Sequence, residues 1–324
     1  IDDDSWSGKW NTTKSMQISA IASVLNAINA DAIMIIEAPD SSMDKSSITA
    51  LETFSEKFNL RQNKAIIGFA NDTRQEIAFL YDPLIMDVEH RPKGLATGTT
   101  GAHDNPRFDG VFYLDVDVDA KPEKITFSKP PLELLLTPKV GNPMRLIGVH
   151  AKSKAPHSAK TSKQELRISI ENRRKQLAQC IWLRNRVEQH LDTGDDLVVL
   201  GDFNDGPGLD EYEKLFGRSG IEIVMGFGKP LNRVLHEPHA EAAMSARSGT
   251  APTTARFYNH KTKTYLNALL DFIMISPNLA KSATPVWKIW HPFNDPECFD
   301  NKDLFDALLT ASDHFPVTID LNLA

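Results

Sequence analysis

Apolar and polar positions along the chain predict strands that alternate with helices. Apolar side chains recur at three- and four-residue intervals between residues 12 and 29, which is the spacing of an amphipathic helix. The apolar run at residues 32–36 ends at Glu37, as expected of a buried strand. Further short apolar runs predict strands at residues 65–69, 77–81, 112–118, 132–136, 144–149, 197–200, 269–275 and 317–321. A long helix is expected from about residue 163 to residue 190, and a loop at residues 94–105.

These elements favour one α/β domain that spans residues 1–324. The chain is long enough to bury a large core, and neither an internal repeat nor a long, biased linker divides its sequence. Hydrophobic residues make up 41% of the chain and charged residues 24%, which is typical of a soluble globular protein. No apolar run reaches the length of a membrane span. Cys180 and Cys298 cannot build a disulfide framework, so we expect both to be reduced.

Charge is distributed unevenly along the chain. The formal net charge of −7 argues against a protein that coats nucleic acid nonspecifically. Residues 152–175 nevertheless hold eight Lys or Arg and two Asp or Glu, which gives this segment a net charge of +6. The segment is either a solvated loop and helix face or a rim that steers a polyanionic substrate. It contains no aromatic residue that would stack on bases.

Polar side chains stand where the predicted strands begin or end. The set comprises Glu37, His150, Asp202, Asn204, Asp271, Asp313 and His314. A carboxylate buried in an apolar strand, such as Asp271, is costly without a partner, and a histidine is a natural one. Hard carboxylates such as Glu37 and Asp313 suit Mg²⁺. The strand ends together indicate one active site assembled from several strands.

Each of these residues taken alone has an ordinary explanation. Glu37 would be a solvated strand end, and Asp202 with Asn204 would form an Asx turn. Asp271 would belong to a structural ion pair, and His150 would cap a strand. It is the combination that favours one shared active site.

The residues in this order resemble the endonuclease/exonuclease/phosphatase superfamily. That superfamily includes deoxyribonuclease I, exonuclease III, sphingomyelinases and inositol polyphosphate 5-phosphatases. The sequences Gly-Asp-Phe-Asn at 201–204 and Ser-Asp-His-Phe-Pro-Val at 312–317 carry the resemblance. His-Ala-Lys-Ser-Lys at 150–154 is similar to the histidine segment of bacterial members. The resemblance extends from Trp10 to Leu321 and implies a four-layer α/β sandwich, in which two packed mixed β-sheets are flanked by helices.

The resemblance implies catalytic roles for five residues. Asp202 would orient or deprotonate the attacking water, and Asn204 would hold the phosphate and that water. His314, paired with Asp271, would act as general base or as a charged stabiliser of the transition state. His150 would donate to a non-bridging phosphate oxygen or assist the leaving group. Such roles suit phosphoryl chemistry, which needs positive charge on the phosphate oxygens and an in-line water.

The resemblance also implies a metal site and a phosphate site. Glu37 would bind Mg²⁺, for which Mn²⁺ could substitute, and Asp313 would lie near or in the same metal shell. The substrate phosphate would be bound by His150, Asn204, Lys152 and Lys154.

Family members begin with a strand that ends in an asparagine supporting the metal and the phosphate. Asn11 stands in a suitable place for that asparagine. Residues 5–9, however, are short, polar and interrupted by glycine, which is unlike a central strand. Either the strand is irregular and Asn11 keeps the role, or the strand lies upstream of Ile1.

We therefore expect a Mg²⁺-dependent phosphoesterase, and specifically a nuclease that hydrolyses phosphodiester bonds by metal-assisted in-line attack of water. One alternative is a phosphatase or phosphodiesterase for small or lipid-linked phosphates of the inositol phosphate or sphingomyelin type. Another is an inactive binding module on the same fold. The expected partner is nucleic acid or a phosphorylated small molecule, bound by a soluble monomer.

Two further features of the sequence leave alternatives open. The sequence starts at Ile1 rather than at methionine, which is compatible with a cytoplasmic or an exported protein. Trp287, Trp290 and Phe293 would either form a stacking or lipid-facing surface or belong to the core.

Overall fold

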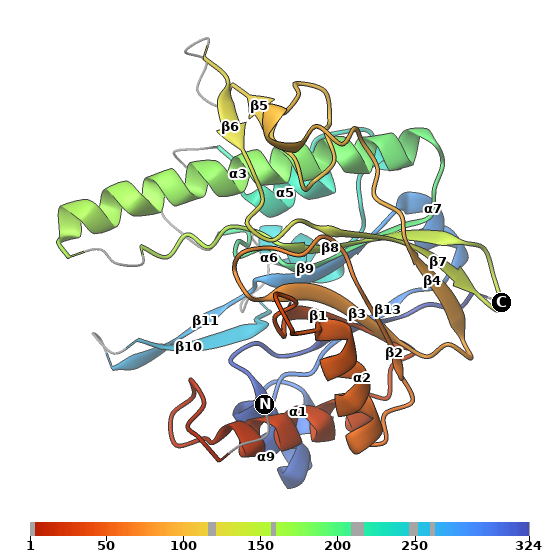
Figure 1. The fold of residues 1–324 in the computed structure, drawn as a ribbon, viewed down its shortest axis with the longest axis vertical. Helices are drawn as coiled ribbons and strands as arrows, with labels where there is room; N and C mark the ends of the chain where they lie inside the picture. Colours follow the sequence, from red (N-terminus) through yellow and green to blue (C-terminus); the bar gives the residue numbers. More distant parts are fainter. Residues whose placement is uncertain are drawn as a thin grey trace.

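A five-stranded mixed sheet forms one layer of the protein (Figure 1) and carries three of the predicted site residues, His150, Asp202 and Asp271. The structure, a computed structural model, describes residues 4–115, 121–156, 160–208, 217–245, 252–259 and 263–323. The strand order of this sheet is β12 (Asp271–Ile275), β9 (Leu197–Asp202), β8 (Met144–His150), β7 (Leu132–Pro138) and β4 (Met86–His90). β8 and β9 are parallel, and the other neighbours are antiparallel.

The second layer consists of antiparallel strands. β1 (Ala32–Ala38) and β2 (Lys64–Ile67) pair on either side of β3 (Glu76–Tyr81). β13 (Val286–Ile289) pairs with β14 (Val317–Asp320). Buried side chains of β3 pack against those of β7 and β8, so the two layers share one apolar core.

Helices cover the outer faces of both layers (Figure 1). The five-stranded sheet is covered by α3 (Ser162–Asp192), α5 (Gly220–Met225) and α6 (Pro238–Met244). Outside the second layer lie α1 (Lys14–Ile28), α2 (Ser47–Lys57) and α9 (Lys302–Ala311). The four-layer α/β architecture predicted from the sequence is confirmed.

Shorter elements connect these layers. They are β5 (Phe112–Leu114), β6 (Glu123–Ile125), β10 (Ala255–Asn259), β11 (Thr264–Ala268), α7 (Pro277–Ser282), α8 (Pro296–Asp300) and two 3₁₀ turns, Gly98–Thr100 and Leu231–Arg233. The strand expected at 112–118 is represented by β5, and its residues 116–118 lie outside the described residues. None of the described helices is both long enough and apolar enough to cross a membrane.

Capping residues fix the helix ends that the sequence predicted. The hydroxyl of Thr13 accepts a hydrogen bond from the backbone N–H of Met16 at the start of α1. Asn29 ends this helix in the left-handed conformation, with φ 48°. Thr161 caps α3 in the same way as Thr13 caps α1. The helices expected at 12–29 and 163–190 are confirmed.

The second layer is open between β1 and β14. Within the described residues these strands are not hydrogen-bonded to each other, and a largely apolar cavity of about 1620 Å³ is lined by both strands, α1 and α2. The layer therefore consists of two antiparallel parts rather than the single mixed sheet expected from the sequence. The reason is that the described residues before α1 form no strand that would join them; Trp6 makes only an isolated bridge to Thr13.

Candidate active site

Three of the predicted site residues form one row across the five-stranded sheet. His150 ends β8 and is the parallel partner of Asp202, which ends β9. Asp202 is also the antiparallel partner of Asp271, the first residue of β12. Directly paired residues on neighbouring strands point to the same face of a sheet. The strand register therefore brings together side chains that lie far apart in the sequence.

The start of the last strand supplies an imidazole to Asp271. Nδ1 of His314 lies 2.8 Å from Oδ2 of Asp271. The hydroxyl of Thr254 donates to the same carboxylate oxygen at 2.8 Å and accepts from the backbone N–H of Asp271 at 3.0 Å. Asp271 is therefore held in a fixed orientation toward His314, which leaves Nε2 of that ring for other partners.

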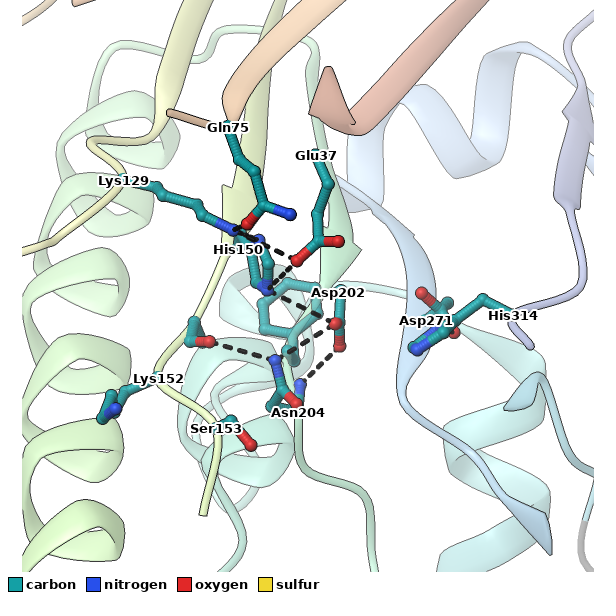
Figure 2. A network of polar contacts seen from close by, with 12 residues as sticks. Glu37, Gln75, Lys129, His150, Lys152, Ser153, Asp202, Asn204, Asp271 and His314 are labelled. Carbon is teal, nitrogen blue, oxygen red and sulfur yellow. Dashed lines mark hydrogen bonds and ion pairs between the residues drawn. The ribbon is translucent and has the colours of Figure 1, made fainter. Parts of the chain in front are cut away.

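Asp202 is fixed by a turn that also forms part of the site. Its Oδ1 accepts from the backbone N–H of Asn204 at 2.8 Å, which is the expected Asx turn. The side-chain amide of Asn204 donates to Oδ2 of Asp202 at 3.0 Å and to the carbonyl of Ala151 at 3.1 Å (Figure 2). Asn204 adopts φ 51°, a conformation that asparagine tolerates better than most residues. The ordinary turn and the site are thus the same structure.

The opposite layer contributes Glu37 through a buried lysine (Figure 2). The ammonium group of Lys129 donates to Oε1 of Gln75 at 2.8 Å and to Oε1 of Glu37 at 3.2 Å. It also lies 3.0 Å from Nδ1 of His150. Because an ammonium group can only donate, Nδ1 of His150 accepts and its proton resides on Nε2. Nε2 of His150 lies 3.6 Å from Oδ2 of Asp202. Lys129 connects the two layers at the site, because it bonds to Glu37 in one layer and to His150 in the other.

The local environment raises the pKa values of Asp202 and His314 and lowers that of His150. Burial and the charge of Asp271 raise the pKa of Asp202 to about 7. Burial lowers the pKa of His314, but the hydrogen bond and charge of Asp271 outweigh it and raise the pKa to about 9. Burial and the charge of Lys129 lower the pKa of His150 to about 4. At neutral pH, His314 is therefore an imidazolium, His150 is neutral, and Asp202 readily exchanges a proton.

The donor set fits a divalent cation. Ligand atoms of Asp202, Asp271 and His314 all lie within 4.8 Å of one another, and because His314 is protonated at neutral pH, only the two carboxylates could bind a cation there. The carboxylates of Asp202 and Asp271 repel each other at this distance, which is one reason why the pKa of Asp202 is raised to about 7. Glu37, half-exposed in β1, already holds the ammonium group of Lys129 against one of its oxygens. Oxygen ligands that need positive charge suit a hard cation such as Mg²⁺ or Mn²⁺.

Two residues predicted to support the metal lie at the periphery. Asp313 is exposed, and its charge acts on Lys9 and on neighbouring His314. Asn11 is exposed in the turn before α1, with φ 51°. Within the described residues, the side chain of Asn11 makes no hydrogen bond to the other predicted site residues.

The two predicted phosphate-binding lysines differ in their surroundings. The ammonium group of Lys154 lies 2.6 Å from Oδ1 of the buried Asp205, which Arg173 also approaches to 3.2 Å. The backbone N–H of Lys152 donates to the side chain of Gln179 on α3, at 2.8 Å. Part of the basic segment thus neutralises an internal carboxylate, and its residues 157–159 lie outside the described residues.

Sequence reasoning missed Lys129, Gln75 and Thr254. Each is a single polar residue without a distinctive motif, and each acquires its role from a partner distant in the sequence. The only local signal for Lys129 is its position at the entrance of the apolar strand β7.

A four-layer sandwich with this site at the ends of its strands defines the deoxyribonuclease I-like class of phosphoesterases. The sequence pattern of the endonuclease/exonuclease/phosphatase family matches residues 8–314, so the chain belongs to that family. It is accordingly a metal-dependent phosphoric ester hydrolase. No curated protein sequence is significantly similar to the chain.

Several solved structures share the fold. The catalytic domain of APE2 from Xenopus laevis has a TM-score of 0.51 and 15% identity, covering 94% of this chain and 87% of that one. The 3′ phosphatase NExo from Neisseria, bound to product DNA hairpin, has a TM-score of 0.47 and 16% identity, covering 94% of both chains. ANGEL2, a 2′,3′-cyclic phosphatase, has a TM-score of 0.45 and 13% identity, covering 95% of this chain and 86% of that one. At this identity the likeness to APE2 shows a shared fold and not a shared substrate.

Proposed function

We propose that the protein is a Mg²⁺-dependent nuclease that hydrolyses phosphodiester bonds by in-line attack of water. The observation that carries the proposal is the row of His150, Asp202 and Asp271, completed by His314. This row places a carboxylate that can take a proton beside an imidazole that is protonated at neutral pH. A base for water and a cation for phosphate oxygens are what such a reaction requires.

Asp202 is the residue that we assign to the attacking water. Its pKa of about 7 lets it accept a proton near neutral pH. The turn that ends in Asn204 restrains both of its carboxylate oxygens, so the base is oriented before substrate binds. Preorganisation of this kind lowers the entropy that must be lost in the transition state.

The two histidines are suited to different oxygens of the phosphate. Asp271 orients His314, and the imidazolium would donate from Nε2 to a non-bridging oxygen and stabilise the charge of the transition state. Neutral His150 carries its proton on Nε2 because Lys129 occupies Nδ1, so it would serve as a hydrogen-bond donor. We assign neither histidine to deprotonation of the water, because neither presents a basic nitrogen to the site.

The acidic residues would hold the divalent cation. Glu37 would bind it together with the neighbouring carboxylates, and exposed Asp313 would lie at the edge of its shell. When bound, such a cation supplies positive charge to the phosphate oxygens and lowers the pKa of a bound water.

A hydrolysis panel tests this proposal. The wild type would be assayed with Mg²⁺ or Mn²⁺ on single-stranded DNA, duplex DNA, RNA, sphingomyelin, inositol phosphates and a chromogenic phosphodiester. We expect cleavage of at least one nucleic acid. If only sphingomyelin or inositol phosphates were cleaved, the substrate would be a small or lipid-linked phosphate and the proposed nuclease activity would be wrong.

Asp202→Asn tests the assigned base. This change keeps the shape of the side chain and removes its ability to accept a proton, so we expect kcat on the best substrate to fall by roughly 10²- to 10⁴-fold. Asp306→Asn is the matched control, because Asp306 forms an exposed ion pair with Lys302 on α9. An Asp202→Asn enzyme with full activity would contradict the assignment.

A further inference from the structure

The hairpin of β10 and β11 begins directly at the catalytic histidine. Ala255 forms a β-bridge with His314, and the backbone N–H of Arg256 donates to the carbonyl of Asp313 at 2.8 Å. The ring of Phe257 meets the ring of His314 edge-on, with centroids 5.4 Å apart. From this root the two strands project away from the body of the molecule (Figure 1). The root of the hairpin therefore lies directly beside the site, with the ring of Phe257 turned toward His314 and its sequence neighbours on the opposite face of the hairpin.

One face of this hairpin combines aromatic rings with an arginine. The register pairs Tyr258 with Tyr265, so both side chains lie on the face that also carries Arg256. Tyr258 is 44% exposed and Tyr265 is 56% exposed, and the centroids of their rings lie 5.2 Å apart. The guanidinium of Arg256 lies 4.2 Å from the ring of Tyr265 and 4.5 Å from that of Phe293. We call Arg256, Tyr258, Tyr265 and Phe293 the hairpin face.

The sequence left open whether three aromatic residues, Trp287, Trp290 and Phe293, belong to the core or to a binding surface, and the structure divides them between the two. Trp287 packs in the core between the layers and donates to the carbonyl of Ile273 at 2.8 Å. Trp290 packs against the cluster formed by α1 and α9. Only Phe293 is exposed, and it belongs to the hairpin face.

The hairpin is also a basic segment of an acidic protein. Residues 252–268 contain three Lys or Arg and no Asp or Glu, whereas the whole chain has a net charge of −7. Residues 259–263 read Asn-His-Lys-Thr-Lys. This charge complements a polyanion.

We propose that the hairpin face binds the bases of single-stranded nucleic acid whose backbone enters the site. The inference rests on the proposed function and names its substrate class. Exposed tyrosine rings accept the faces of any base, and those faces are accessible only when the strand is not paired, while the guanidinium of Arg256 beside the rings adds positive charge for the backbone. A lipid surface fits less well, because residues that enter a membrane interface are mainly Trp, Phe and Leu, whereas the two most exposed rings of this face, Tyr258 and Tyr265, carry hydroxyl groups and residues 259–263 are all polar.

Binding of a labelled oligothymidylate tests this proposal independently of catalysis. Fluorescence anisotropy would be measured in EDTA, so that no hydrolysis occurs. We expect Tyr258→Ala and Tyr265→Ala each to raise Kd by about 5- to 150-fold, the effect of losing one stacked base. Tyr265→Phe keeps the ring and should bind like the wild type. Phe227→Ala removes an exposed ring in the loop after α5 and is the matched control.

The chromogenic phosphodiester separates the two proposals. It is too small to reach the hairpin face, so the tyrosine variants should hydrolyse it at the wild-type rate, which also shows that they are folded. Unchanged oligothymidylate binding in both variants, or no binding by the wild type, would overturn the role of the hairpin without touching the proposed function. If the two tyrosine variants lost binding to sphingomyelin–phosphatidylcholine vesicles but still bound oligothymidylate, the hairpin face would be assigned to lipid instead. A wild type that hydrolyses neither the diester nor any nucleic acid would refute the proposed function itself.

Discussion

His314 and Asp202 respond in different ways to the same neighbour, Asp271. The negative charge of Asp271 stabilises the imidazolium of His314 and raises its pKa to about 9. The same charge, added to burial, makes ionisation of Asp202 unfavourable and raises its pKa to about 7. Because the three groups interact closely, each of their protonation states depends on the others. A single carboxylate thus keeps His314 protonated at neutral pH and brings the pKa of Asp202 close to neutral pH.

The protonated His314 should stabilise the fold in a pH-dependent way. Its pKa is higher in the folded protein than the ordinary 6.5, so its contribution is fully present below pH 6.5 and is lost as the pH rises through about 9. The contribution amounts to at most about 3 kcal/mol. In EDTA, the difference in free energy of unfolding between the wild type and His314→Gln should shrink over this range, as measured by urea denaturation. Exposed His103→Gln is the control, and a trend common to both variants would argue against the Asp271 pair as its cause.

Lys129 should determine the protonation of His150. In Lys129→Met the repulsion from the ammonium group disappears while burial persists, so the pKa of His150 should rise from about 4 but stay below its ordinary value. An NMR titration of the imidazole resonances in EDTA measures this change. Lys139→Met, which removes an exposed partner of Asp87, is the control. If the pKa of His150 does not move, burial alone accounts for it.

At the scale of elements, the site depends on two irregular strand positions. Glu37 has φ 67° at the register shift between Ile36 and Ala38, so the bulge in β1 determines where this carboxylate points. Gly201 has φ 136°, and a Cβ atom there would lie 2.0 Å from the carbonyl oxygen of Val149. Only glycine therefore permits β9 to approach β8 just before Asp202.

Gly201→Ala should damage both stability and site. The forbidden contact and the positive φ together should lower the free energy of unfolding by about 3–5 kcal/mol. Gly194→Ala is the matched control: Gly194 also has positive φ, but no atom lies within 4 Å of its Cβ position, so we expect a loss of about 1–2 kcal/mol. Urea denaturation distinguishes the two. Equal losses of stability in the two variants would mean that the contact with Val149 does not contribute to the effect of Gly201→Ala.

The elements themselves were largely predictable, and their pairing was not. Amphipathic spacing and capping residues are local signals, so α1 and α3 follow from the sequence. Short apolar runs located β8, β9 and β12 because buried strands are continuous and apolar. The division of the second layer and the cavity beside β14 depend on which strands meet, and no local pattern encodes that.

At the scale of the whole molecule, the packing of the two layers creates the site. Glu37 belongs to one layer and His150 to the other, and Lys129 bonds to both. The site therefore exists only when the layers are packed. Stability of the fold and binding at the site should be coupled for this reason.

Divalent cations should stabilise the folded protein. Binding to the native state alone adds about 2.7 kcal/mol when the cation is present at a hundred times its Kd. We expect Mg²⁺ or Mn²⁺ to raise the Tm of the EDTA-treated wild type, and to raise that of Glu37→Gln less. Calorimetry or differential scanning fluorimetry provides the measurement. An equal rise in both proteins would show that the cation binds away from Glu37.

The sequence by itself determined the two long helices, the buried apolar strands, the layered α/β class and the polar residues at the strand ends. It could do so because apolar spacing, caps and the Gly-Asp-Phe-Asn and Ser-Asp-His-Phe-Pro-Val sequences are local properties of the chain. The tertiary structure alone decided which of these residues meet. It made Asp271 the partner of both Asp202 and His314, placed Lys129 between Glu37 and His150, and put an aromatic hairpin beside His314. These contacts arise from strand register and layer packing, which join residues remote in sequence, and pKa values follow from the burial and charges that only such packing creates.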